Sequence, residues 1–311
     1  MFYISTNNQR LITFLTLIGS LILPLQCIDF VPTRGTSFAE IAGEIPETVR
    51  ILLKYIKDRQ RFIELGAEPY KGILFYGPPG TGKTALARAL AGEAGVPFFA
   101  VKTTELLSKW YGETEDNIRR CFAAVRAAAA ESTPQMAVLF LDEIDSIGRT
   151  RQDSDPSWVT SVINTLLEEM DGFASDNSVL VIASTNRFDS LDPALVRPGR
   201  LDTHVYIGLP EIAARQAIID FYLKKIKFEH VSSCEQYQAF LKKITKETDG
   251  FSAAELAYVI KDSARQAAYQ DLCIVPEALV YQVIKAFKQK KGLFSAELLY
   301  EQEVKPFLAE N

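Results

Sequence analysis

The chain has 311 residues, of which 48% are hydrophobic and 23% charged, so most of it should fold into globular domains. Its net charge of −5 argues against a protein built mainly to neutralise a phosphate backbone, and we expect no nucleic-acid partner. The cysteines are far apart and form no CxxC pair, which predicts reduced, mostly buried thiols; they are Cys27, Cys121, Cys234 and Cys273.

The first distinct segment, residues 11–28, carries no charge and is rich in leucine and isoleucine. As a helix rising about 1.5 Å per residue, it would be barely long enough to cross a bilayer. Residues 1–28 therefore have three interpretations: a membrane anchor, a cleaved signal peptide, or a buried helix or incorrectly assigned start. Residues 29–46 contain two prolines and two glycines, which predicts a linker.

From residue 47 to residue 210, short apolar segments alternate with segments of helical periodicity. We predict strands at 72–76, 97–101, 137–141, 179–184 and 204–207, and helices at 47–64, 85–94, 113–131 and 155–170. This alternation predicts an α/β domain whose parallel sheet is covered on both faces.

After residue 210 the sequence shows helical periodicity only, which predicts a small all-helical domain over residues 211–290. Its helices are expected at 211–227, 234–248, 252–270 and 277–289. Residues 291–311 are assigned to a C-terminal tail.

A segment between the first predicted strand and the next helix matches GxxxxGK[ST]. It consists of Gly77, Pro78, Pro79, Gly80, Thr81, Gly82, Lys83 and Thr84, and Ala85 continues the helix. Its glycines let backbone N–H groups converge on a phosphate at the N-terminus of the helix. Lys83 should reach the β- and γ-phosphates of ATP, and the Thr84 hydroxyl should bind Mg²⁺. The alternative is a glycine-rich turn without a ligand.

The third predicted strand ends in an acidic pair, Asp142 and Glu143, with Asp145 close by. Ligands of an open α/β sheet bind at the carboxyl ends of its strands. We expect Asp142 to hold Mg²⁺ through water, and Glu143 to orient and polarise the attacking water. An ordinary strand-end carboxylate is the alternative.

Three segments, residues 75–84, 139–145 and 184–202, resemble the Walker A, Walker B and second region of homology of AAA ATPases. The resemblance covers roughly residues 37–275. It implies a RecA-like P-loop NTPase domain with a helical lid, ATP and Mg²⁺ as cofactors, and a homo-oligomeric ring, by analogy a hexamer.

The resemblance also assigns roles to single residues. Asn186 falls at the sensor-1 position, where an amide holds the lytic water or the γ-phosphate. Arg197 and Arg200 fall at the arginine-finger positions, which reach the γ-phosphate of the neighbouring subunit. A surface arginine pair in a Pro-Gly turn is the alternative. Residues 171–173 are similar to the inter-subunit signalling segment.

The implied adenine pocket lies in two other segments. Residues 40–43 are similar to the family segment that would place Ile41 and Ala42 against the base. Residues 250–256 look like the lid motif GFSGADL, which brings Ala253 and Ala254 to the nucleotide. Ala253 replaces a usual glycine, and Tyr222 stands where many relatives have a histidine. The effect of both on affinity is open.

Residues 108–113 resemble the first pore loop of katanin, spastin and the ATPase that disassembles ESCRT filaments. Trp110 would then grip a threaded polypeptide, supported by Lys109 and Tyr111. An aromatic pair packed in a core is the alternative interpretation of this segment.

Residues 38–43 and 65–67 instead resemble the membrane-anchored bacterial AAA proteases, whose zinc protease domain carries HExxH. The two histidines, His204 and His230, are not in such a motif, so we expect no peptidase activity from this sequence. If residues 11–28 form an anchor, they would attach the ATPase domain to the membrane, and that domain must face the cytoplasm to meet ATP.

Three functions follow from these interpretations. The first is a motor that unfolds or remodels protein substrates through a central pore. The second is a nucleotide-gated assembly scaffold at a membrane without threading. The third, a relative that acts on DNA such as a clamp loader, is not supported by the charge or by any added nucleic-acid module.

Overall fold

The computed structural model of the protein describes residues 30–38, 41, 43, 45–67, 70–108, 112–149, 157–172, 178–229 and 234–299. The chain divides into two units, residues 1–31 and 32–311, and the helices and strands of the described residues lie in the second unit. Within those residues, no helix combines the length and apolar character needed to cross a membrane. The apolar segment 11–28 lies outside the described residues.

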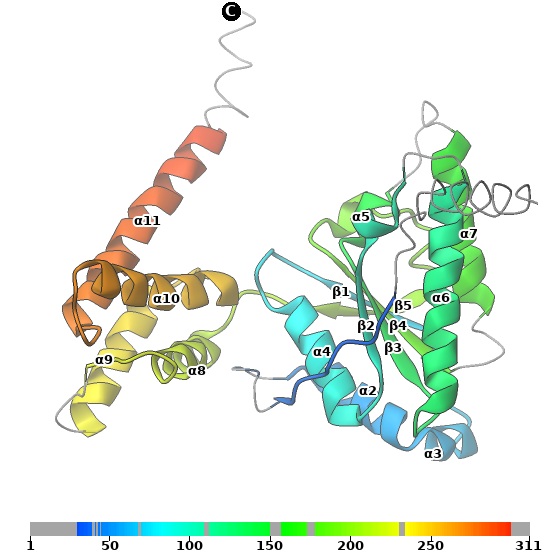
Figure 1. Ribbon diagram of the computed structural model, residues 1–311, viewed down its shortest axis with the longest axis horizontal. Coiled ribbons are helices and arrows are strands. Elements are labelled where there is room, and N and C mark those ends of the chain that lie inside the picture. The colour runs from blue at the N-terminus through cyan, green and yellow to red at the C-terminus, as the bar shows by residue number, and fades with distance from the viewer. Residues whose placement is uncertain are drawn as a thin grey trace, which may run out of the picture. The chain divides into compact units, whose positions relative to one another are not determined.

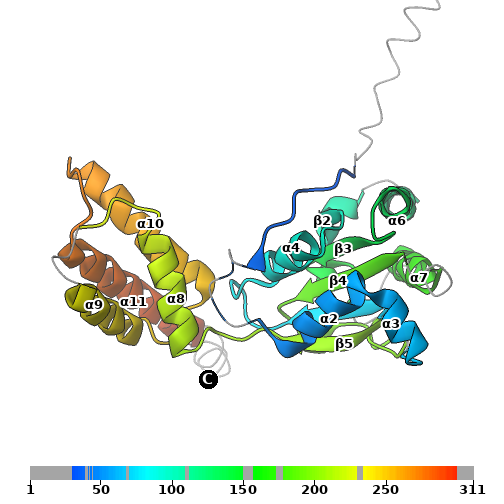
Figure 2. The ribbon, with the colours of Figure 1, turned by 90° about the horizontal axis from the view of Figure 1, so that it is seen from below.

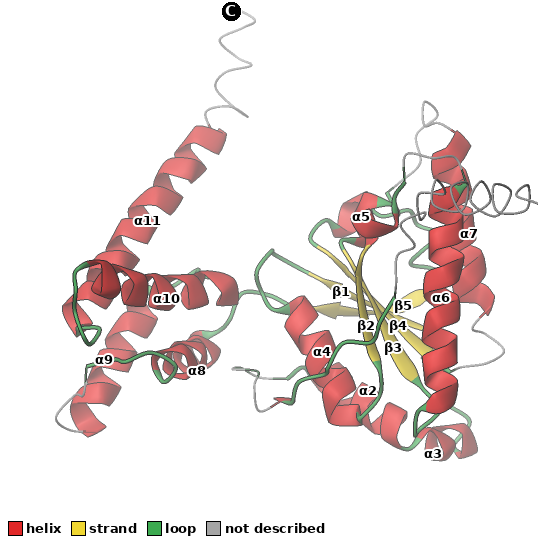
Figure 3. Cartoon of the chain, viewed as in Figure 1, coloured by secondary structure: helices red, strands yellow, loops and turns green. Residues whose placement is uncertain are grey.

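Five parallel strands form one sheet in the order β2-β3-β4-β1-β5 (Figures 1 and 3). The strands are β1 (Gly72–Tyr76), β2 (Phe98–Lys102), β3 (Ala137–Asp142), β4 (Val179–Thr185) and β5 (Leu201–Tyr206). The central strands are almost entirely buried, as expected when both faces of a sheet are covered. The predicted α/β class is therefore confirmed.

The last strand begins earlier than its predicted range of 204–207. It starts at Leu201, which pairs with Gly72. Because β5 is an edge strand, its exposed residue Asp202 and half-buried residue Thr203 interrupt the apolar run that marks the central strands.

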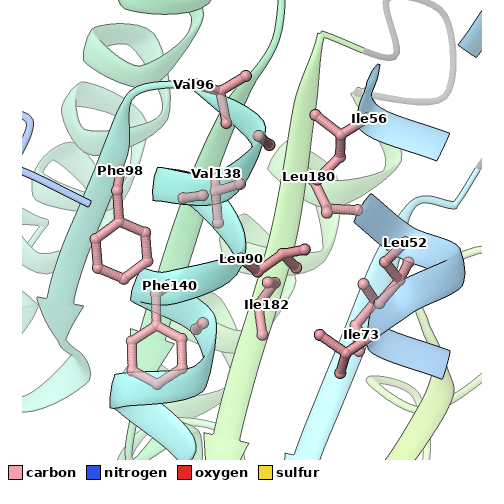
Figure 4. Close-up of a cluster of buried hydrophobic side chains, with 14 of the residues drawn as sticks. Leu52, Ile56, Ile73, Leu90, Val96, Phe98, Val138, Phe140, Leu180 and Ile182 are labelled. Carbon is pink, nitrogen blue, oxygen red and sulfur yellow. The ribbon is translucent and has the colours of Figure 1, made fainter. Parts of the chain in front are cut away.

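Helices cover the two faces of the sheet (Figure 1). On one face lie α2 (Glu47–Lys57) and α4 (Lys83–Ala94), and on the other lie α6 (Glu113–Glu131) and α7 (Ser157–Gly172). In the core of the first face, Leu52 of α2 and Leu90 of α4 lie against side chains from the sheet, which include Ile73, Val138, Phe140, Leu180 and Ile182 (Figure 4). Each such burial stabilises the fold by about 1.5–3 kcal/mol.

The helix predicted over residues 47–64 is wrong in one respect, because it is broken at Asp58. The backbone of Asp58 has φ −142° and ψ 60°, outside the helical region. Its side chain accepts a hydrogen bond from the Arg61 N–H (3.4 Å) and so caps a separate short helix, α3 (Arg59–Glu64). The apolar periodicity continues across the break.

Part of the predicted linker 29–46 packs on the α/β part of the chain. The Thr33 N–H donates to the Phe98 carbonyl (2.7 Å), which adds an isolated antiparallel bridge beside β2. At Gly35 a Cβ would lie 2.3 Å from the Cα of Gly92 in α4. The two backbones therefore approach more closely than any side chain would permit.

The second part of the chain is helical and has its own apolar core. Its helices, α8 (Ile212–Leu223), α9 (Cys234–Glu247), α10 (Ala253–Tyr269) and α11 (Glu277–Leu299), pack together (Figure 2). The helix predicted at 277–289 thus continues ten residues further, into the predicted tail.

The cysteines differ from their predicted burial. Cys121, on the inward face of α6, is buried, and burial raises the pKa of its thiol to about 12. Cys234 and Cys273 are exposed, because one begins α9 and the other lies in the turn before α11. The prediction of mostly buried thiols is therefore wrong for two of the three that the structure describes.

Candidate nucleotide-binding site

The loop between β1 and α4 has a backbone that only glycine adopts readily. Gly77, Gly80 and Gly82 have φ of 138°, 74° and 97°. A Cβ on Gly77 would also lie 2.3 Å from the Ile207 carbonyl oxygen. Gly82 begins α4 without a side-chain cap, so the first N–H groups of the helix stay available for an anion.

Lys83 projects into this loop and is only 7% exposed. Its ammonium donates to the carbonyls of Gly77 (2.9 Å) and Pro78 (2.8 Å) and to Oδ1 of Asn186 (2.7 Å). Burial lowers the pKa of Lys83, and the charge of Asp142 opposes this effect. Its three acceptors are neutral, and a phosphate oxygen would be a stronger one. The loop therefore fits a nucleotide phosphate.

Thr84 and Asp142 meet beside the lysine. The Thr84 hydroxyl donates to Oδ2 of Asp142 (3.1 Å), and the Ser184 hydroxyl donates to Oδ1 of the same carboxylate. Hydroxyl and carboxylate oxygens are the ligands that Mg²⁺ prefers. Because both oxygens of Asp142 are oriented by hydroxyl groups, these residues fit a magnesium site.

Glu143 follows in a left-handed conformation, with φ of 56°, which is uncommon for a residue with a side chain. Its N–H donates to the Ser184 hydroxyl (3.4 Å), and its carbonyl accepts from the Thr103 hydroxyl (2.5 Å). The side chain is exposed at the end of β3. Two side chains thus hold the backbone of Glu143 in this uncommon conformation at the end of β3.

The hydroxyl residues around the acidic pair were not predicted. Thr103, Ser184 and Thr185 are buried, and Thr185 donates to Oδ1 of Asp145 (2.7 Å) in the short helix η2 (Ile144–Ser146). One signal was available, since Ser184 and Thr185 end an otherwise apolar strand directly before Asn186.

The two candidate finger arginines have different surroundings. Arg200 is paired within its own chain: Nε and Nη2 donate to both oxygens of Asp171 (3.0 and 2.8 Å), and Nη1 donates to the Ala194 carbonyl (2.8 Å). These hydrogen bonds lower the pKa of Asp171 and raise that of Arg200. Arg197 is exposed, and within the described residues its side chain has no hydrogen bond or ion pair.

The predicted adenine-pocket residues are described only in part. Ala254 at the start of α10 lies at the phosphate loop, where its N–H donates to the Gly80 carbonyl (2.9 Å), and Ala253 precedes it. Ile41 is half-buried, whereas Ala42 lies outside the described residues. Tyr222 packs against the core of the helical part.

The predicted pore residues Lys109, Trp110 and Tyr111 also lie outside the described residues. The two ends of their segment are joined. The Ser108 N–H donates to the Thr114 hydroxyl (2.9 Å), and the Ser108 hydroxyl donates to Glu113.

The fold and this loop define a P-loop nucleotide-binding protein. Residues 73–209 match the model of the family described as "ATPase family associated with various cellular activities (AAA)". The chain therefore contains an AAA ATPase domain.

Three curated relatives carry the same kind of name. The chain is 40% identical over 241 residues to the "ATP-dependent zinc metalloprotease FtsH" of Hahella chejuensis, a match that covers 76% of this chain and 37% of the relative. The FtsH of Photobacterium profundum is 40% identical over 238 residues, 75% of this chain and 32% of the relative. "FtsH 2" of Methylacidiphilum infernorum is 40% identical over 237 residues, 75% and 35% respectively.

The chain thus spans about a third of the length of these curated relatives. Their names include zinc. In the part of this chain that the structure describes, no group of three or more His, Cys, Asp or Glu side chains could hold a metal ion.

Proposed function

We propose that the protein hydrolyses ATP to ADP and phosphate with Mg²⁺, at a site that a neighbouring copy completes in a ring. We further propose that this cycle unfolds or remodels protein substrates through a central pore. One observation carries the ATPase proposal. Lys83 is hydrogen-bonded to Asn186, and Thr84 to Asp142, at the carboxyl ends of neighbouring strands.

Each residue has a task in this proposal. Lys83 binds the β- and γ-phosphates, and Thr84 and Asp142 hold Mg²⁺, which supplies positive charge against the phosphates. Glu143 orients a water molecule and accepts its proton, while Asn186 fixes the position of that water or of the γ-phosphate. Arg197 and Arg200 place positive charge at the γ-phosphate bound by the neighbouring copy.

The ring and its hexameric size rest on family resemblance. A cytoplasmic ATPase anchored through residues 11–28 rests on the apolar sequence of that segment and on the need for ATP. The second candidate is a nucleotide-gated scaffold at a membrane. Trp110→Ala separates the two candidates. A motor keeps its ATPase activity and loses substrate processing, whereas a scaffold loses neither nucleotide-dependent assembly nor turnover.

The central test is steady-state ATP hydrolysis measured over a range of protein concentrations for the wild type, Glu143→Gln and Arg200→Ala. We expect activity per subunit that rises with concentration in the wild type and is lost in both variants. Activity that is independent of concentration and survives Arg200→Ala would contradict the shared site. Nucleotide binding without turnover would favour the scaffold.

A further inference from the structure

A buried arginine in the helical part has no assigned role. Arg215 of α8 is 6% exposed. Nη2 forms an ion pair with Oδ1 of Asp249 (2.9 Å), and Nη1 donates to the Pro210 carbonyl (2.9 Å). Nε is buried and has no hydrogen-bond partner among the residues that the structure describes. Burying a charge this deeply costs free energy unless it is paired and hydrogen-bonded, so the position of Arg215 depends on these two partners.

The two partners of Arg215 lie in segments that each lead to the phosphate loop. On one side, Pro210 follows Ile207, whose N–H donates to the Tyr76 carbonyl (2.8 Å) and whose carbonyl lies against Gly77. Gly77 is the first residue of the phosphate loop. Residues 207–210 join the α/β part to the helical part and are called the hinge. They are therefore fixed to the start of the phosphate loop.

On the other side, Asp249 lies in the turn before α10. Residues 249–254, from this turn to the first residues of α10, are called the helix entry. Two residues of that helix entry lie at Gly80: a Cβ on Gly80 would be 3.0 Å from the Ser252 hydroxyl and 2.9 Å from the Ala254 Cβ. The Ala254 N–H donates to the Gly80 carbonyl (2.9 Å). Contacts thus run from Gly77 through the hinge, Arg215 and Asp249 and return to the same loop at Gly80.

The start of α10 is also held from α11. Lys291 donates to the Gly250 carbonyl (3.0 Å) and to Glu255 (3.0 Å). Ser252 and Glu255 form a reciprocal capping box. These hydrogen bonds hold the helix entry together. Arg215 connects it to the hinge, because its guanidinium group binds the Asp249 carboxylate and the Pro210 carbonyl at the same time.

We propose that Arg215 is a positioning residue for the nucleotide, which holds residues 249–254 against Gly80 and so slows nucleotide release. This inference rests on the proposed function insofar as the nucleotide binds at the phosphate loop. Without Arg215, residues 249–254 lose their tie to Pro210, keep their contacts with Gly80, and open more often. The effect should appear in the dissociation rate, with little change in the association rate.

The test is the release of a fluorescent ADP analogue with Mg²⁺, followed by stopped flow. We expect about tenfold faster release from Arg215→Gln, since the variant loses the charge-assisted hydrogen bonds to Asp249 and Pro210. Asp249→Asn should give about a two- to threefold increase, because the Asp249 side chain is 83% exposed. The matched control is Arg265→Gln in α10, whose side chain is 69% exposed and lies 4.0 Å from Asp262; it should match the wild type.

Two further measurements distinguish positioning from general stability. Arg215→Lys keeps the charge but not the fork, so its release rate should lie between those of the wild type and Arg215→Gln. The double variant with Asp249→Asn should release no faster than Arg215→Gln alone. A lower melting temperature with an unchanged release rate, in both Arg215→Gln and Asp249→Asn, would overturn the inference. A wild type that binds no nucleotide would instead overturn the proposed function, and the inference with it.

Discussion

The phosphate loop (residues 77–84) and the turn that carries Arg197 and Arg200 differ in one respect. They differ in whether the partners of their charged side chains come from the same chain. At the loop, Lys83 has three oxygen acceptors and Asp142 has a hydroxyl donor on each oxygen, all from the same chain. At the turn, Arg200 is paired with Asp171, but Arg197 is exposed and without a partner in the described part of the chain. The first site is preorganised for a ligand, whereas the second presents a charge outward. This contrast is what a catalytic site divided between two copies requires.

The strongest test of the contrast is Arg197→Ala. We expect turnover to fall by about 10³-fold, the order of an arginine finger, while nucleotide affinity stays within about twofold. The reason is that, within the described residues, the Arg197 side chain has no hydrogen bond or ion pair with the phosphate loop of its own chain. Steady-state ATPase assays and binding of a fluorescent nucleotide measure the two quantities separately.

Mixing experiments show whether Arg197 acts between copies. Arg197→Ala subunits retain Glu143, and Glu143→Gln subunits retain Arg197, so mixed rings contain some complete sites. Activity should return on mixing, although each variant alone is inactive. No recovery on mixing, in rings shown to exchange subunits, would mean that Arg197 acts at the site of its own subunit and not at that of its neighbour.

The second test is Lys83→Ala, which should weaken nucleotide binding by about 10²-fold. The expected loss corresponds to charge-assisted hydrogen bonds of about 1.5–3 kcal/mol each. Isothermal titration with ADP and Mg²⁺ measures it. The matched control is Lys102→Ala, since Lys102 ends β2, the next strand along the chain, but is exposed. Equal affinity in the two variants would mean that the buried lysine does not bind phosphate.

Much of this contrast could be predicted from the sequence, because the phosphate loop is a local pattern. Eight consecutive residues between an apolar strand and a helix predict the loop, and the carboxyl end of β3 predicts Asp142 beside it. The parallel sheet follows from strands that are apolar throughout, since burial on both faces removes the alternation of polar residues.

Other features depend on contacts between distant segments, which no local pattern records. Asp171 and Arg200 are 29 residues apart, and the Ser184 hydroxyl on Asp142 comes from a strand whose other residues are apolar up to that point. The break at Asp58 was missed for a different reason. A side-chain cap can interrupt a helix without disturbing its apolar periodicity.

The third test addresses the pair that holds Arg200. We expect Asp171→Asn to lower turnover by at most about fivefold, because a partly exposed ion pair contributes about 1 kcal/mol or less. Arg200→Ala should reduce it much further, since it also removes the charge proposed to act on the neighbouring copy. Equal losses in the two variants, without additivity in the double variant, would show that Arg200 only holds its own turn.

The smallest expected effect is on stability against acid. Hydrogen bonds from Arg200 hold the pKa of Asp171 below its ordinary value, with the charges of Arg200 and Lys71 acting in the same direction and burial opposing them. A carboxyl whose pKa is lower in the folded state stabilises the protein above its unfolded pKa of about 3.9, and loses that contribution as the pH falls towards the folded value. The melting temperature of the wild type should therefore exceed that of Asp171→Asn by a constant amount between about pH 6 and pH 8, and the difference should shrink below about pH 4. A difference that grows on acidification would mean that protonated Asp171 is the form favoured by folding, and the ion pair with Arg200 would then not account for the position of the turn.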